Sequence, residues 1–152
     1  MPLLRTRLTV GLVSLTVIGL ELSLMRSLSL RFWHHFAYMV ISVALLGFGA
    51  SGTALTLLRR RIARSPQAWL AGAALAFAVS IPLMNGLACR VPLNVPFLSW
   101  DLGQIGYVLL LELALFVPFL LGACTIGMAL MDPPERIAGH YAANLVGSGT
   151  GG

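Results

Sequence analysis

Two glutamates inside long apolar segments are the residues of this chain whose type and position most strongly suggest chemistry. Glu21 lies in the apolar run from Leu8 to Leu24, and Glu112 lies in the run from Ile105 to Met131. An ionisable side chain inside a lipid-spanning segment is costly, so it marks either an internal ion pair or a site for a substrate, ion or proton. Both carboxyl groups are therefore candidate functional groups.

The partner of Glu21 cannot be the nearest arginine along the chain. Glu21 and Arg26 are five residues apart, so on a helix they point about 140° from each other, whereas a pair on one face needs a spacing of three or four. We expect Glu21 to meet another helix, with Arg90 or a histidine as candidates. A structural ion pair, a substrate or proton role and a carboxyl exposed at the interface all stay open.

Other polar side chains fall at a depth similar to that of the two glutamates. Arg26, Asn85 and Arg90 lie at this depth near the ends of their segments, whereas Tyr141 and Asn144 are included because they form a polar strip in the last segment. Together with Glu21 and Glu112, the candidate substrate or ion pathway comprises Arg26, Asn85, Arg90, Tyr141 and Asn144. Arg31, His34 and His35 are further polar residues at this depth.

The elements that position these residues are predicted to be membrane-spanning helices. Apolar residues make up 58% of the chain and charged residues 10%, whereas a soluble domain carries about 25% charged residues. A helix needs about 20 apolar residues to cross a hydrocarbon core of about 30 Å. The sequence predicts an all-α, polytopic transmembrane helix bundle, a single membrane domain with four complete helices and a truncated fifth, at about 8–30, 36–58, 68–89, 105–131 and 140–152.

The predicted fifth helix, from His140 to Gly152, would span about 20 Å, which is short of a crossing. A natural terminus seldom leaves half a helix in lipid with its last carbonyl groups unsatisfied. We therefore expect the sequence to be a fragment. Its expected partners are the lipid bilayer and either missing downstream helices or a soluble domain of the same protein.

Arginine supplies all ten basic residues, and its distribution over the predicted loops indicates the orientation. One side collects Arg5, Arg7, Arg59, Arg60, Arg61, Arg64 and Arg136, and the other collects Arg26, Arg31 and Arg90. The positive-inside rule places the first side, and with it the N-terminus, in the cytoplasm. Trp33, Trp69 and Trp100 fall near predicted helix ends, as interfacial aromatic residues do. The predicted location is the inner (plasma) membrane.

Small residues indicate where helices approach each other closely. In the first helix Thr9, Thr16, Gly19, Ser23 and Ser27 follow a heptad-like stripe, and in the last segment Ala143, Gly147 and Gly151 share one face. Such stripes allow close helix packing in lipid. The predicted packing residues are Gly19, Gly47, Ser51, Gly122, Gly147 and Gly151.

Several kinds of site are not indicated by the sequence. The string Gly47 to Gly52 matches a dinucleotide-binding pattern, but it lies mid-helix with no preceding strand. Cys89 and Cys124 have no CxxC or Cys/His spacing, so neither a metal site nor a disulfide is predicted. The net charge of +5 reflects short loops of a membrane protein rather than a nucleic-acid partner. No cofactor is expected.

The motifs of the chain, taken in order, resemble those of a known family. They are Glu21 with Arg26 and a following Leu-Ser-Leu, a small-residue helix ending in an arginine loop, Pro118-Phe119 followed by Gly122, and Tyr141-Ala-Ala-Asn144-Leu-Val-Gly147. This set resembles the multi-helix membrane domain that precedes the catalytic domain of membrane-bound spermidine-synthase-like proteins. The helix order and arginine loop also resemble the first half of a major facilitator transporter.

The resemblance implies a role but no catalytic residue. In that family aminopropyl transfer belongs to a soluble Rossmann-like domain that binds decarboxylated S-adenosylmethionine and a polyamine. No residue of this chain is a candidate for that chemistry, so the chain is expected to be non-catalytic, whether or not the full-length protein is an aminopropyltransferase-like enzyme. We expect a membrane anchor or a transport or sensing module. The alternatives are the N-terminal half of a major facilitator-like secondary transporter and a helix-packing protein without a ligand.

The resemblance implies a polyamine as the candidate small-molecule ligand. Its cations would suit carboxylates buried in lipid, such as those of Glu21 and Glu112. The sequence itself does not identify a substrate.

Overall fold

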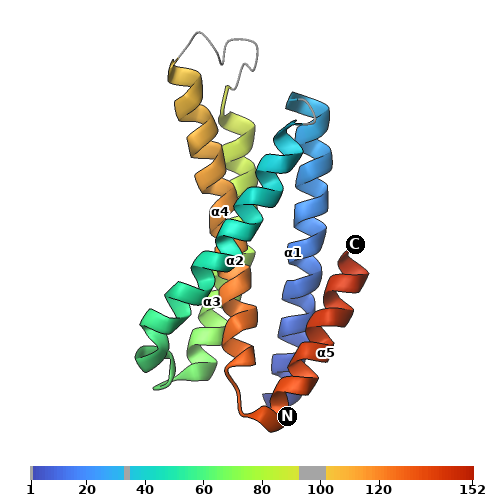
Figure 1. The fold of residues 1–152 in the computed structure, drawn as a ribbon, viewed down its shortest axis with the longest axis vertical. Coiled ribbons are helices and arrows are strands. Elements are labelled where there is room, and N and C mark those ends of the chain that lie inside the picture. Colours follow the sequence, from blue (N-terminus) through green and yellow to red (C-terminus); the bar gives the residue numbers. More distant parts are fainter. Residues whose placement is uncertain (1, 33–34, 93–101) are drawn as a thin grey trace.

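The computed structural model of the chain describes residues 2–32, 35–92 and 102–152. These residues form five α-helices, shown in Figure 1 and named α1 (Pro2–Phe32), α2 (His35–Ile62), α3 (Pro66–Arg90), α4 (Leu102–Leu130) and α5 (Pro134–Gly151). The described residues include no strand, so the predicted all-α class is confirmed. Trp33, His34 and Trp100 lie outside the described residues, as do the side chains of Arg31 and His35.

Four of the helices are long and apolar enough to cross a membrane. Their lengths are 31, 28, 25 and 29 residues for α1 to α4. The apolar stretches within them are Leu3–Leu30, Ala37–Ile62, Pro66–Arg90 and Gly103–Leu130. The sequence therefore located these elements correctly, although the helices extend by several residues beyond some of the predicted ends.

The fifth helix begins at Pro134 rather than at His140, and it contains 18 residues. Proline is favoured at the first helical position because its fixed φ suits the helix and its missing N–H would have no intrahelical partner there. Glu135 follows in the first turn, where a negative charge is stabilised by the helix dipole. The segment around Arg136, which was predicted to be a loop, is therefore the start of a helix, with Pro133 and Pro134 at its N-terminus.

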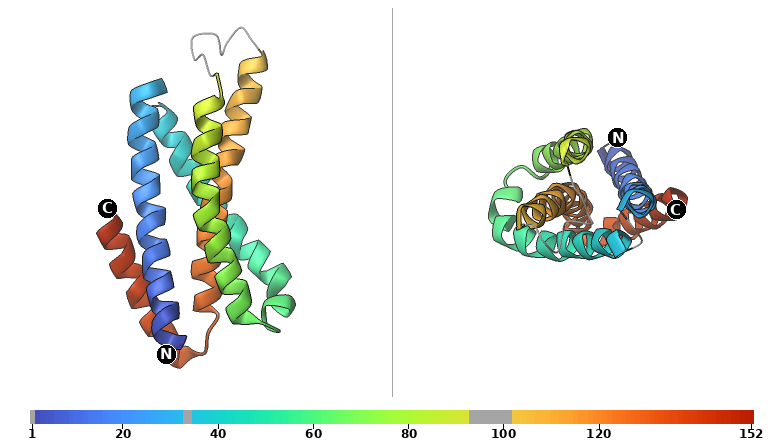
Figure 2. Two further views of the ribbon diagram at one scale, coloured as in Figure 1. Left: turned by 180° about the vertical axis from the view of Figure 1, so that it is seen from behind. Right: turned by 90° about the horizontal axis from the view of Figure 1, so that it is seen from above.

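α4 is the central helix of the bundle. It packs mainly on α2 and α3 and also contacts α1 and α5. The end-on view of Figure 2 shows α3, α2 and α1 arranged around it. Its side chains Leu115 and Phe119 are fully buried and belong to the main hydrophobic core. The core is thus built around α4, and α5 is added to it mainly through α1.

The outside of the bundle is covered by large apolar side chains. Leu30 and Leu57 are about four-fifths exposed, at 81% and 80%. Other strongly exposed leucines lie on every one of the four long helices, among them Leu4, Leu45, Leu75 and Leu109. A water-soluble domain rarely exposes contiguous apolar surface on this scale.

Candidate functional site

Glu21 and Glu112 are both partly buried, on α1 and α4. Each lies in the half of its helix away from the turn between α2 and α3. Neither forms an ion pair or hydrogen bond with a side chain that the structure describes. Arg90 is exposed and does not lie within ion-pair distance of Glu21. Within the described residues, the two carboxyl groups therefore have no neutralising partner.

The other predicted pathway residues are spread over several surfaces. Arg26 on α1, Asn85 on α3 and Tyr141 on α5 are exposed. Among the described side chains, no hydrogen bond or ion pair joins any of them to Glu21 or Glu112. The structure therefore does not gather these residues into one closed pocket.

Asn144 is placed differently from the rest of this group, because it joins α5 to α1. The Ser14 hydroxyl lies 2.6 Å from Asn144 Oδ1 and 2.8 Å from the carbonyl oxygen of Val10. A hydroxyl carries one hydrogen, so these two acceptors share it. Ser14 is fully buried. Asn144 thus takes part in a polar contact between two helices.

Three of the predicted packing residues lie where α1 and α5 run against each other. A side chain added at Gly147 would meet the backbone of Gly11, and one added at Gly151 would meet the backbone of Leu15. A Cβ added at Gly19 would lie 3.5 Å from the carbonyl oxygen of Gly151. The two helices touch through their backbones here, which requires glycine on α5.

The remaining predicted packing residues lie around α4. A Cβ added at Gly47 of α2 would lie 2.9 Å from the backbone nitrogen of Leu120, and one at Gly122 would lie 2.7 Å from Val17 Cγ2. The Ser51 side chain is buried and its hydroxyl donates to the carbonyl oxygen of Phe48 in the same helix, at 2.6 Å. Close packing of α2 and of α1 on α4 therefore requires glycine at positions 47 and 122.

A histidine that was not among the predicted site residues is fully buried in the first half of α5. His140 is fully buried on α5, and its Nε2 lies 3.1 Å from Asp132 Oδ2 in the turn between α4 and α5. A carboxylate only accepts hydrogen bonds, so Nε2 is the donor. The other ring nitrogen, Nδ1, is buried without a partner among the described atoms. The Arg7 guanidinium packs over Gly139 next to this pair.

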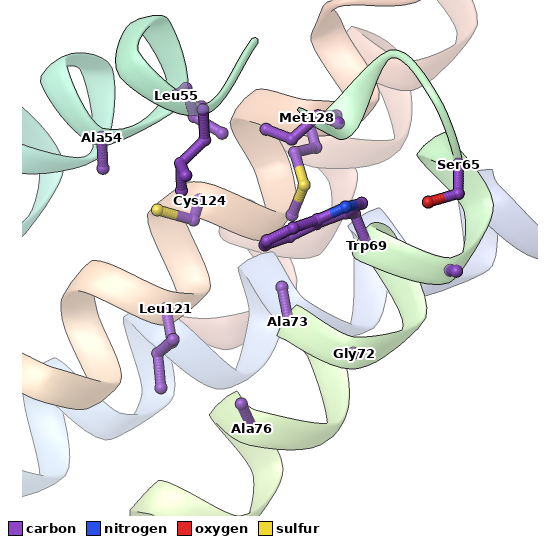
Figure 3. A pocket seen from close by; sticks show the side chains of 13 residues that line it. Ala54, Leu55, Ser65, Trp69, Gly72, Ala73, Ala76, Leu121, Cys124 and Met128 are labelled. Carbon is purple, nitrogen blue, oxygen red and sulfur yellow. The ribbon is translucent and has the colours of Figure 1, made fainter. Parts of the chain in front are cut away.

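Several hollows open on the surface of the bundle, one of them of about 630 Å³ between α2 and the end of α4, with Arg59 and Asp132 in its lining. An apolar groove of about 480 Å³ lies between α2, α3 and α4, with Trp69, Leu55 and Met128 among its walls (Figure 3). α1 and α3 hardly touch each other, and two hollows of about 450 and 320 Å³ lie between them, with Arg5 and Gln67 lining the first. None of these hollows contains Glu21 or Glu112.

The described residues do not form a metal site, because no three His, Cys, Asp or Glu side chains come together among them. Cys89 is exposed on α3 and Cys124 is partly buried on α4. Both thiols are free among the residues that the structure covers.

Comparisons with models of known protein families, with curated proteins and with solved structures gave no match. Function is therefore inferred from the residues and their geometry.

Proposed function

We propose that the chain is a multi-pass domain of the inner (plasma) membrane. The observation that carries this proposal is the set of four helices with apolar stretches of 25 to 28 residues. At 1.5 Å per residue these stretches are about 37 to 42 Å long, enough to cross a hydrocarbon core of about 30 Å with some tilt. The exposed leucines on the outside of the bundle suit contact with lipid chains.

We place the N-terminus in the cytoplasm. Figure 1 shows the N-terminus, the turn between α2 and α3 and the turn between α4 and α5 at one end of the bundle. Seven of the ten arginines belong to these three segments, namely Arg5, Arg7, Arg59, Arg60, Arg61, Arg64 and Arg136. The positive-inside rule supports a cytoplasmic location for that end.

As to its role, we propose a non-catalytic membrane module of a spermidine-synthase-like protein, acting as an anchor or in transport or sensing. The resemblance of the sequence supports this role, above all the run from Tyr141 to Gly147. Asn144 and Gly147 of that run contact α1, which gives the motif a part in building the membrane bundle. A small-molecule ligand, if the module has one, would be a polyamine.

A second candidate is the N-terminal half of a major facilitator-like secondary transporter. Glu21 and Glu112 favour it, because each is a partly buried carboxyl group in an apolar helix with no ion-pair partner among the described side chains. Such groups are typical of substrate or proton pathways.

Labelling of single cysteines tests the membrane embedding and the orientation. We would replace Cys89 and Cys124 with serine and introduce Arg64→Cys or Arg90→Cys, both at exposed positions at opposite ends of α3. A membrane-impermeant maleimide should label position 90 in intact cells and position 64 only after permeabilisation. The reverse pattern would overturn the orientation. Release of the chain from membranes by alkaline carbonate would overturn the embedding.

A further inference from the structure

The apolar groove between α2, α3 and α4 has an incomplete wall. α2 and α3 follow each other in the chain but hardly touch, and the end-on view of Figure 2 shows α4 between them. Apart from Trp69, the α3 wall is made of small residues, including Gly72, Ala73 and Ala76, so it leaves room that no side chain fills. Trp69 and Met128 both line this space (Figure 3). With about 480 Å³, it falls within the roughly 300–1,000 Å³ typical of small-molecule sites.

An arginine cluster stands at the turn end of this groove. It consists of Arg59, Arg60, Arg61 and Arg64, all exposed, and none of them forms an ion pair with a carboxylate that the structure describes. Ala54 and Leu58 line the groove. Arg61 follows Leu58 by three residues, so it continues the same helical face by one turn. Arginines that form no described ion pair therefore lie near the end of the apolar groove, and the carboxylate of Asp132 lines an adjoining hollow with Arg59.

We propose that the groove and the arginine cluster together bind an anionic phospholipid of the cytoplasmic leaflet. One acyl chain would lie in the groove along Trp69, and the phosphate would lie at Arg61 and Arg64. The guanidinium group binds phosphate oxygens through two parallel hydrogen bonds, and basic segments at the cytoplasmic surface attract anionic lipids. This inference rests on the proposed membrane embedding and orientation.

The charge of the arginine cluster favours an anionic phospholipid over a neutral one as the occupant of the groove. If the arginines acted only as orientation signals, lipid would enter the groove regardless of its headgroup. If they bind the headgroup, an anionic lipid must be enriched beside Trp69 relative to phosphatidylcholine. The two cases differ in a quantity that fluorescence can measure, because Trp69 lines the groove.

The test uses quenching of Trp69 by brominated lipids. Trp33→Phe and Trp100→Phe leave Trp69 as the sole tryptophan, and the chain is reconstituted in phosphatidylcholine vesicles. We expect brominated phosphatidylglycerol to quench Trp69 at a several-fold lower mole fraction than brominated phosphatidylcholine. The variant R61Q/R64Q should abolish this preference while keeping Arg59 and Arg60. Equal quenching by both lipids in the parent chain, or an unchanged preference in R61Q/R64Q, would overturn the proposal.

A pair of glycine substitutions separates occupation of the groove from general lipid contact. Gly72 and Gly86 both lie on α3, and a side chain added at either meets no atom within 4 Å, but only Gly72 lines the groove. Gly72→Leu should therefore remove the preference for the anionic lipid, and Gly86→Leu should retain it. Retention in Gly72→Leu would also overturn the proposal. Absence of Trp69 quenching by either lipid would instead count against the membrane embedding itself.

Discussion

Gly147 illustrates how a single residue sets the distance between two helices. The backbone of Gly11 occupies the space in which a side chain of residue 147 would lie. In lipid, helices associate through close van der Waals packing rather than through a hydrophobic driving force, so small residues at the contact matter most.

Gly147→Ala should therefore destabilise the bundle, although alanine in a helix is intrinsically favoured over glycine by about 0.5–1 kcal/mol. Overpacking of a tight contact costs about 1–3 kcal/mol, so we expect a net loss, measured as a lower midpoint of unfolding in detergent. Gly149→Ala is the matched control, because Gly149 lies on the same helix and a Cβ added there would have no atom of another helix within 4 Å. It should be neutral or stabilising, and equal effects of the two variants would contradict the packing.

The contact between the buried His140 and the partly exposed Asp132 joins α5 to the turn that precedes it. Asp132→Ala would leave His140 Nε2 without its acceptor at 3.1 Å. An unsatisfied buried group costs about 1–3 kcal/mol, so we expect the free energy of unfolding in detergent to fall by about that amount. Asp132→Asn keeps an acceptor oxygen and should retain most of the stability. A loss as large in Asp132→Asn would show that charge, rather than the hydrogen bond, is what matters.

At the scale of elements, the docking of α5 on α1 is the feature that links the ends of the described chain. Ser14 and Asn144 lie 130 positions apart in sequence and 2.6 Å apart in space. In a background of Cys89→Ser and Cys124→Ser, the pair Ser14→Cys and Asn144→Cys should form a disulfide on mild oxidation. The disulfide would be measured on gels after cleavage of the chain between α1 and α5, because the two fragments should then separate only when the sample is reduced. Ser14→Cys with Val146→Cys is the control, because Val146 is 66% exposed. Efficient crosslinking of the control would contradict the register.

The elements of this fold were largely predictable, but their contacts were not. Apolar segment length locates α1 to α4, because only long apolar runs match the thickness of a bilayer. A small-residue stripe identifies the contact face of a helix but not its partner, so the sequence indicated Gly147 without indicating Gly11. His140 and Asp132 are eight residues apart across a helix start, and no periodic pattern connects such a pair. The start of α5 at Pro134 was not predicted, because the consecutive residues Pro133 and Pro134 indicated a loop.

For the whole molecule, the proposed transport role differs from the proposed anchor role in the use it would make of Glu21 and Glu112 in the membrane. Both lie in apolar helices away from the arginine-rich end, and neither has a described ion-pair partner. A carboxylate kept in this position without neutralisation costs free energy, which a cationic substrate or a proton would offset. An anchor gains nothing from that arrangement.

If the module moves a polyamine, Glu21→Gln and Glu112→Gln should each lower spermidine uptake by cells that produce the protein by about tenfold or more, since tenfold corresponds to only about 1.4 kcal/mol of lost interaction. Radiolabelled spermidine and immunoblots of the membrane fraction would separate lost uptake from lost protein. Glu135→Gln is the matched control, because Glu135 is an exposed carboxylate in the first turn of α5. Normal uptake in both variants would remove the case for these carboxylates in transport, and loss of the protein from the membrane would assign them to helix packing instead.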